Sequence, residues 1–127
     1  QPNTKFQGVF KEIEELKKNY FIITGTNTDW NFLNEVQSDF KYNAVQTTEK
    51  YIPLFNSNFN AFYIEDVGFS EFPPLDNIFG TVKFSTSMQT IIFNSVNGIK
   101  MNSPMLAVYK VGNNRRTVLF GENVWKW

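Results

Sequence analysis

The sequence predicts an α/β fold: a mixed sheet of about five strands, with N-terminal helices packed on it and a C-terminal antiparallel hairpin. The first third of the chain runs from a helix pattern to a short apolar strand, a glycine-containing loop and a second helix pattern, which is typical of a layered fold. The last third is rich in strand-like segments separated by Gly and Asn turns. The alternative is an α+β arrangement, in which a leading helix packs on a curved antiparallel sheet.

The first helix is predicted by apolar side chains at the i, i+3, i+4 and i+7 spacing of one helical face: Phe6, Val9, Phe10, Ile13 and Leu16. Charged residues occupy most of the other positions, and Glu14 stands four residues before Lys18, which adds a little support to a helix. We expect this helix to end near Asn19 and its charged side to face solvent.

A strand over 20–24 and a second helix are predicted next. The strand residues Tyr-Phe-Ile-Ile-Thr are apolar without alternation, which favours a short buried strand closed by Gly25. Residues 26–29 supply side chains that cap helices. The second helix is expected to turn one side to the core, carrying Trp30, Leu33, Val36 or Gln37, and Phe40.

The middle of the chain is less regular, and the last third is β-rich. Pro53 cannot donate to a sheet ladder, so 51–55 is predicted as an edge strand. The segment 59–64 is either strand or irregular, and the double proline makes 72–75 an extended loop. Further strands are predicted at 81–84, 90–93, 105–111 and 117–120, with a turn at Asn97-Gly98 and a hairpin connection at Gly112-Asn113-Asn114. The expected core residues are Phe21, Ile22, Ile23, Leu33, Ile91, Ile92, Leu106, Val108, Val118 and Leu119.

Composition excludes several classes of function. The 127 residues suit a single domain over 1–127, and they contain neither Cys nor His. This excludes disulfides, thiolate and imidazole metal sites, cysteine nucleophiles and His-based triads, so we expect no enzyme, no metal and no cofactor. Lys and Arg together number 12, as do Asp and Glu, and Arg115-Arg116 alone is too short a basic patch for nucleic acid. No apolar run approaches the ~20 residues that span a bilayer, so direct membrane insertion of this segment is not expected.

The loop after the first strand is the best candidate for a ligand site. In open α/β sheets, ligands lie beyond the carboxyl ends of strands, and helix N-termini favour anions. The candidate ligand-binding residues are Thr26, Asn27, Asp29 and Trp30. Because Asn, Thr and Asp are also preferred helix caps, capping without a ligand is the competing interpretation.

Carboxylates near the double proline are a second candidate: Glu65, Asp66, Glu71 and Asp76. Two of them facing each other would supply the acid and the base of a hydrolase. Adjacent carboxylates usually diverge, and surface carboxylates are usually solvated, so this hypothesis ranks last.

Several segments, taken in order from about Phe6 to the end, are similar to one family. They are Thr24-Gly25-Thr26-Asn27-Thr28-Asp29-Trp30, Phe72-Pro73-Pro74-Leu75 with Phe79-Gly80, Pro104-Met105-Leu106-Ala107, and Gly121-Glu122-Asn123-Val124-Trp125-Lys126-Trp127. The chain resembles the later half of a glutamine amidotransferase-like domain, which occurs at the end of bacterial membrane-anchored proteins that also carry a von Willebrand factor A-like region.

The resemblance implies an α/β sheet inherited from an amidotransferase-like ancestor, without amidotransferase chemistry, because class I enzymes need a Cys, a His and a Glu. Both the start at Gln1 and the last motif, which continues beyond Trp127 in such domains, lead us to expect an excised part of a larger domain. The implied setting is the bacterial cell envelope, periplasmic or membrane-associated through the parent protein.

The preferred hypothesis is therefore a non-catalytic interaction or scaffolding domain that docks through an uncovered apolar face. Its partners would be other domains of the parent protein or envelope proteins, with a homo-oligomer as a further option. The alternative function is a small-ligand or carbohydrate-binding module that uses aromatic stacking beside polar hydrogen bonds.

Overall fold

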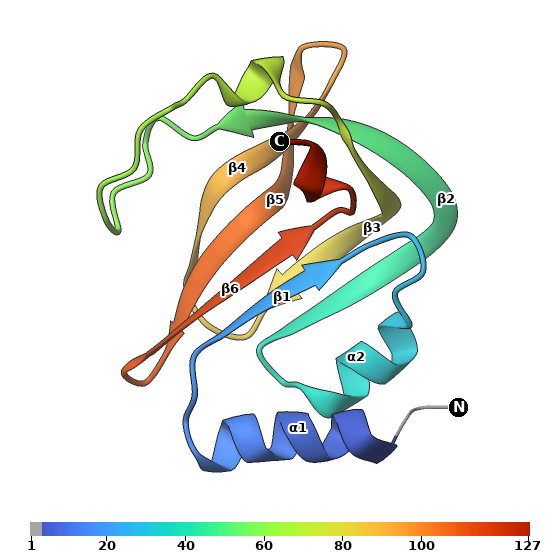
Figure 1. Cartoon of the computed structure of the whole chain (residues 1–127), viewed down its shortest axis with the longest axis vertical. Helices are drawn as coiled ribbons and strands as arrows, with labels where there is room; N and C mark the ends of the chain where they lie inside the picture. The colour runs from blue at the N-terminus through green and yellow to red at the C-terminus, as the bar shows by residue number, and fades with distance from the viewer. Residues whose placement is uncertain (1–3) are drawn as a thin grey trace.

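A computed structural model describes residues 4–127, which form a mixed six-stranded sheet with two helices, broadly an α+β fold (Figure 1). The elements are α1 (Thr4–Glu15), β1 (Tyr20–Thr24), α2 (Trp30–Val36), β2 (Phe40–Phe55), the 3₁₀ turn η1 (Phe69–Glu71), β3 (Leu75–Phe84), β4 (Met88–Val96), β5 (Ile99–Val111), β6 (Asn114–Phe120) and the 3₁₀ turn η2 (Val124–Lys126). The strand order is β1-β6-β5-β4-β2-β3.

The mixed sheet, the N-terminal helices and the C-terminal hairpin were predicted correctly. The α/β class and the number of strands were not, because the sheet is mostly antiparallel and has one more strand.

The strand pairings explain why the fold departs from a layered α/β protein. Within residues 4–127, β1 and β6 form a parallel pair, and every other neighbouring pair is antiparallel. Two hairpins join β4 to β5 and β5 to β6, at the turns that the sequence predicts. Asn97, Gly98 and Gly112 have φ of 50°, 75° and 60° there, a left-handed backbone that Asn and Gly adopt at low cost.

β2 is a long, bent strand that the sequence did not predict as one element. Its first part pairs with β3, and the register shifts between Ala44 and Thr48. Such an irregularity bends a strand and increases its twist, and Figure 1 shows β2 curving around one side of the molecule. The curl brings the start of β3 to the end of β6, where the Glu122 N–H donates to the Asp76 carbonyl at 2.9 Å.

The predicted edge strand at 51–55 is the end of β2, which lies inside the sheet order. Pairing with β3 stops at Tyr51, so residues 52–55 pair with β4 alone. One side of β2 is therefore unpaired around Pro53, which is where a residue without an N–H is tolerated.

Phe40 was expected on the second helix but begins β2. The segment 59–64, predicted as either strand or irregular, contains no helix or strand.

α1 ends at Glu15, four residues before the predicted end near Asn19. Its last turn closes with two bonds: the Lys18 N–H donates to the Ile13 carbonyl at 2.9 Å, and the Lys17 N–H donates to the Glu14 carbonyl at 3.3 Å. Lys17 has a φ of 49°. This is the Schellman arrangement, with a lysine in the left-handed position that glycine usually takes.

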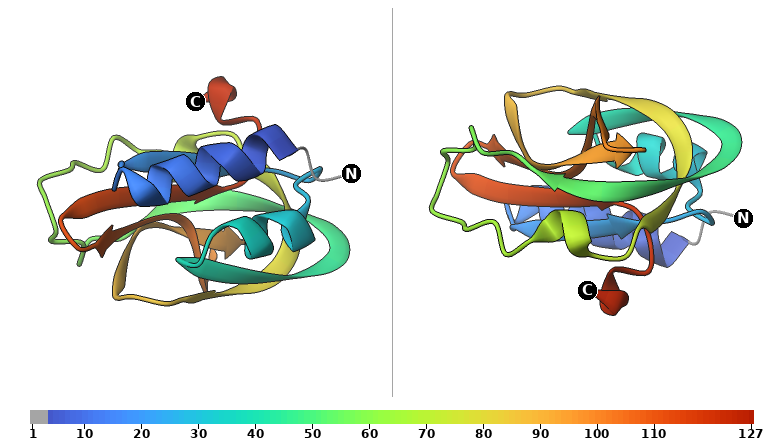
Figure 2. Two further views of the ribbon diagram at one scale, coloured as in Figure 1. Left: turned by 90° about the horizontal axis from the view of Figure 1, so that it is seen from below. Right: turned by 90° about the horizontal axis from the view of Figure 1, so that it is seen from above.

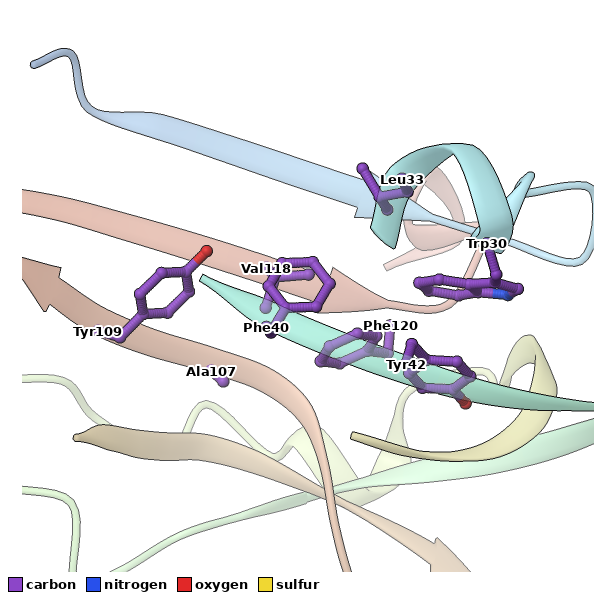
Figure 3. Packing of buried hydrophobic residues seen from close by; sticks show 8 residues of the cluster. All are labelled: Trp30, Leu33, Phe40, Tyr42, Ala107, Tyr109, Val118 and Phe120. Atoms are coloured by element: carbon purple, nitrogen blue, oxygen red, sulfur yellow. The ribbon is translucent and has the colours of Figure 1, made fainter. Parts of the chain in front are cut away.

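The first core cluster fills the space between the curled sheet and α2 (Figure 3). Its buried members are Trp30, Leu33, Phe40, Tyr42, Ala107, Tyr109, Val118 and Phe120. Trp30 stacks on Tyr42 with ring centroids 4.0 Å apart, and Phe40 and Phe120 meet edge to face at 5.7 Å. The abundance of aromatic residues is therefore partly explained by this core.

A second core cluster lies where the irregular segment after β2 and the C-terminal residues pack on the sheet. Its buried members are Tyr51, Leu75, Ile91, Ile92, Met105, Val108 and Leu119. Of the ten core residues predicted, Leu33, Ile91, Ile92, Val108, Val118 and Leu119 are buried, and Ile22 and Leu106 are half-buried. Phe21 and Ile23 are 58% and 55% exposed, so their assignment to the core was wrong.

Candidate functional site

The loop predicted to bind a ligand lies between β1 and α2, and its polar groups are mostly engaged. Asp29 caps α2, because its Oδ1 accepts the Phe32 N–H at 3.0 Å. Trp30 is buried in the first core cluster and presents no free ring face there. Asn27 is exposed. The capping interpretation therefore holds for Asp29, and Trp30 serves the core.

A carboxylate of the chain itself occupies the anion-binding groups of this loop. Glu122 follows β6, and its Oε2 accepts the Thr26 N–H at 2.9 Å while its Oε1 accepts the Thr26 hydroxyl at 2.9 Å. The sequence reasoning located an anion-binding loop, but it did not identify Glu122 as the anion. Glu122 reaches this loop because β1 and β6 run parallel and end side by side at Thr24 and Phe120.

Gly25 makes this close approach possible. A Cβ atom built at Gly25 would stand 2.3 Å from Glu122 Oε2 and 2.9 Å from Glu122 Cβ, so any larger residue would force the two segments apart. The open depression beside it, of about 300 Å³, is lined by Ile23, Thr24, Gly25, Asn27, Thr28 and Glu122. With Glu122 already bonded to Thr26, this depression offers an external anion a like charge.

Three of the four candidate hydrolase carboxylates accept hydrogen bonds within the chain. Asp66 Oδ1 accepts the N–H groups of Gly68 and Phe69 at 2.9 and 3.0 Å, which shapes its own turn. Asp76 Oδ2 accepts the Asn123 side-chain amide at 2.9 Å, and Glu65 accepts the Tyr63 hydroxyl. Glu71 is exposed at the end of η1. These contacts are those of turn-forming and solvated residues.

A buried charged cluster, not predicted from the sequence, joins α1, the start of β2 and β6. Arg116 is 1% exposed, and its Nη1 donates to Glu14 Oε1 and to Asp39 Oδ2, each at 2.6 Å. The Tyr20 hydroxyl donates to Asp39 Oδ2 at 2.5 Å and also bonds the Tyr109 hydroxyl. The Arg116 guanidinium lies 4.9 Å from the centre of the Tyr20 ring.

The protonation states in this cluster are fixed by burial and by the hydrogen bonds. Burial, with the bonds to Asp39 and Tyr109, raises the pKa of Tyr20, and burial raises the pKa of Tyr109. Burial by itself would lower the pKa of Arg116, but the hydrogen bonds to Glu14 and Asp39 outweigh it and raise that pKa. The cluster therefore holds a cation, two carboxylates and two neutral phenols, and its geometry serves to tie elements together.

The most unusual exposed feature is apolar and lies on α1 and β1. Five large side chains here are each 49–58% exposed: Phe6, Val9, Leu16, Phe21 and Ile23. We call them the α1–β1 surface. α1 lies alongside the β1 end of the sheet (Figures 1 and 2). These side chains come from two elements that follow each other in the chain, and exposed apolar side chains that gather on one side mark interaction surfaces on soluble domains.

The α1–β1 surface exists because two elements turn only part of their apolar side to the core. On β1, side chains alternate: Tyr20 and Ile22 pack against the first core cluster, so Phe21 and Ile23 point the other way. On α1, Phe10 packs on the core and Glu14 reaches Arg116. At about 100° per residue, Val9 and Leu16 are turned away from Phe10 by roughly 100° and 120°, whereas Phe6 is turned by roughly 40° and is exposed near the start of the helix.

Comparisons with protein-family models, curated proteins and solved structures give no match to this chain. Among residues 4–127 there is no group of three or more acidic side chains placed to hold a metal ion. In the same residues, no helix has the length and apolar character needed to cross a membrane.

The contact between Gly25 and Glu122 can be tested with a double-mutant cycle. We expect Gly25→Ala and Glu122→Ala each to lower the free energy of unfolding by about 1–3 kcal/mol, the first by a clash and the second by loss of a charged hydrogen bond. In the double variant the closest clash, with Oε2, disappears and only the Cβ contact at 2.9 Å remains, so the losses should be non-additive by more than about 0.5 kcal/mol in urea unfolding. Strict additivity would show that the two residues act separately.

The buried phenols predict a specific loss of stability at high pH. Burial, together with neighbouring Tyr51, raises the pKa of Tyr42 to about 12, and the pKa values of Tyr20 and Tyr109 are raised as well. An unfolded tyrosine loses its proton near pH ~10. Above that pH the folded chain holds more protons than the unfolded chain, so the free energy of unfolding falls as pH rises, by up to about 1.4 kcal/mol per pH unit for each phenol.

The measurement is a titration followed by phenolate absorbance and circular dichroism. Below pH ~10 stability should not depend on these three groups, and above it their ionisation and unfolding should proceed together. A complete phenolate titration by pH ~11 with an unchanged dichroism spectrum would contradict the role given to these buried phenols.

Proposed function

We propose that the chain is a non-catalytic interaction domain of a larger bacterial envelope protein, and that it docks through the α1–β1 surface. The observation that carries this proposal is the exposure of Phe21 and Ile23 on a strand whose other side chains are in the core. Covering five half-exposed apolar side chains would remove a substantial apolar area from water, at about 25 cal/mol per Å².

The parallel pairing of β1 with β6 supports the same proposal. Sheets made only of parallel strands are found almost only with both faces covered, usually by helices. Here the first core cluster covers one face of the pair, and on the other face Leu119 of β6 is buried in the second core cluster whereas Phe21 and Ile23 of β1 are exposed. The β1 side of this face is therefore apolar and uncovered within residues 4–127.

A helix with an apolar stripe is the partner that fits this geometry best. Placed across β1 beside α1, it would cover Phe21 and Ile23 and contact Val9 and Leu16, much as adjacent helices pack on one face of a layered fold. The segment would belong to another domain of the parent protein or to an envelope protein. A second copy of this chain, paired through the same surface, is the competing outcome.

The resemblance to a non-catalytic amidotransferase-like domain agrees with this proposal. With no thiol or imidazole in the sequence, acyl transfer on a cysteine has no nucleophile or base. Asp66 shapes its own turn, Asp76 accepts the Asn123 amide, and the Thr26 loop is bonded to Glu122. We therefore place the function in docking, in the periplasm or at the membrane through the parent protein.

A photo-cross-linking experiment in the intact parent protein tests the proposal. A benzophenone side chain placed at position 21 or 23 should form cross-links to one defined segment, identified by mass spectrometry as having an apolar helical stripe. The matched control is position 45, since Val45 is 53% exposed on β2, away from the α1–β1 surface. Equal background cross-linking from positions 21, 23 and 45 would contradict docking. Cross-links formed only between copies of the chain would show that the partner is a second copy and not a helix of another segment.

Stability measurements on the isolated chain make the result interpretable. Phe21→Ser with Ile23→Ser should change the free energy of unfolding by no more than about 0.5 kcal/mol per site, because surface substitutions are usually small. The same pair should abolish the cross-links from α1 positions 9 and 16, whereas Val45→Ser should not.

A further inference from the structure

A second depression lies on the sheet under the irregular segment that follows β2. It has a volume of about 430 Å³, within the usual range for small-ligand sites. The lining residues that matter here are Asn60, Phe62, Gln89, Val108, Lys110 and Arg115. We call it the Arg115 pocket.

The sheet register places four of these residues on one face. Lys110 lies directly opposite Arg115 on the β5–β6 hairpin, and Val108 lies opposite Gln89 on β4. Val108 and Lys110 are two residues apart on one strand, so their side chains leave the same face. The Asn60 N–H donates to Gln89 Oε1 at 3.4 Å and so fastens the covering segment to β4.

The floor of the pocket carries two positive charges without a counter-charge. Lys110 and Arg115 are exposed, and neither forms an ion pair with a residue in 4–127. The ion pairs in that part of the chain are those of Lys11 with Glu15 and of Arg116 with Glu14 and Asp39. Like charges directly opposite each other destabilise an antiparallel pair. An anionic group between them would remove the repulsion and accept hydrogen bonds from both.

The rest of the pocket suits the body of a ring. Phe62 is 40% exposed, packs on Phe59 in a T-shaped pair with ring centroids 4.8 Å apart, and lines the pocket together with Val108. Asn60, Ser87 and Gln89 supply amide and hydroxyl groups around it. An aromatic ring together with amides is a combination that binds the apolar face and the hydroxyl groups of a sugar.

We propose that the Arg115 pocket binds an acidic monosaccharide, whose carboxylate or phosphate lies between Lys110 and Arg115 and whose ring lies against Phe62. The site shares a sheet face with Phe21, because Arg115 is two residues before Thr117, which lies opposite Phe21 on β1. It is lined by other residues than the α1–β1 surface and does not rest on the docking proposal. The sequence alone does not reveal it, since Arg115 and Arg116 are neighbours in a doublet and only strand alternation separates an exposed from a buried arginine.

NMR titrations of the whole chain with four probes test this proposal. Glucuronate and glucose 6-phosphate each combine the ring with an anion, glucose has the ring alone, and inorganic phosphate has the anion alone. At up to ~20 mM, we expect at least one acidic sugar to shift the amide resonances around 62, 108–110 and 115 saturably, and at least about tenfold more tightly than glucose or phosphate. Whichever acidic sugar binds more tightly identifies the anionic group.

Matched variants separate this site from general charge effects. Lys110→Gln with Arg115→Gln should weaken binding at least about tenfold without lowering the melting temperature, since charged hydrogen bonds are lost and a like-charge pair is removed. Phe62→Ala should also weaken binding. Lys41 and Lys83 are another opposite pair of exposed lysines, on β2 and β3, so replacing both with Gln is the control and should leave binding unchanged.

Several outcomes would overturn the proposal. They are no saturable shift with either acidic sugar, equal binding of glucose or inorganic phosphate, shifts centred outside the Arg115 pocket, or an equal loss of binding in the Lys41 and Lys83 control. Retention of binding in the Lys110 and Arg115 variant would also reject it.

Discussion

The guanidinium of Arg116 joins parts of the chain that are far apart in sequence. It lies 2.6 Å from Glu14 on α1 and from Asp39 just before β2, and it is itself on β6 and almost fully buried. Removing Asp39 would leave a buried, uncompensated charge, which usually costs about 3–5 kcal/mol, whereas the contact with Glu14, which is 42% exposed, contributes less because solvent screens it. The contact of Glu14 with Arg116 turns the Glu14 side of α1 toward the sheet. The side of α1 with Val9 and Leu16 is then exposed to solvent.

This constraint accounts for the exposed apolar surface on which the proposed function depends. Had α1 been held by its stripe alone, Phe6, Val9 and Leu16 would be expected in the core. They are instead about half-exposed, and α1 lies beside β1, the strand that carries Phe21 and Ile23 (Figure 2). The molecule thus combines a fully packed aromatic core with an apolar side that has no partner within residues 4–127.

Local patterns in the sequence predicted the local structure well. The bounds of β1, the capping by Asp29 and the turn at Asn97-Gly98 depend on residues within a few positions of each other, so their chemistry can be read directly. β2 was missed because its register shift and its pairing with two different strands depend on residues far away in the sequence. The candidate site was predicted only in part, since the anion at the Thr26 loop is Glu122, nearly a hundred residues away. Burial of Phe21 and Ile23 was predicted wrongly because apolar composition cannot reveal that one face of a parallel pair stays uncovered.

The Glu14–Arg116 contact, together with Phe10 and not with the exposed side chains Phe6, Val9 and Leu16, holds α1 on the sheet. Amide hydrogen exchange in the Glu14→Gln variant tests it most directly, because Glu14 is partly exposed and the remaining pair of Arg116 with Asp39 should preserve the rest of the fold. We predict that the amides of α1 lose most of their protection while those of β4 and β5 keep theirs. Unchanged protection of α1 would show that its apolar contacts suffice and would contradict the claim.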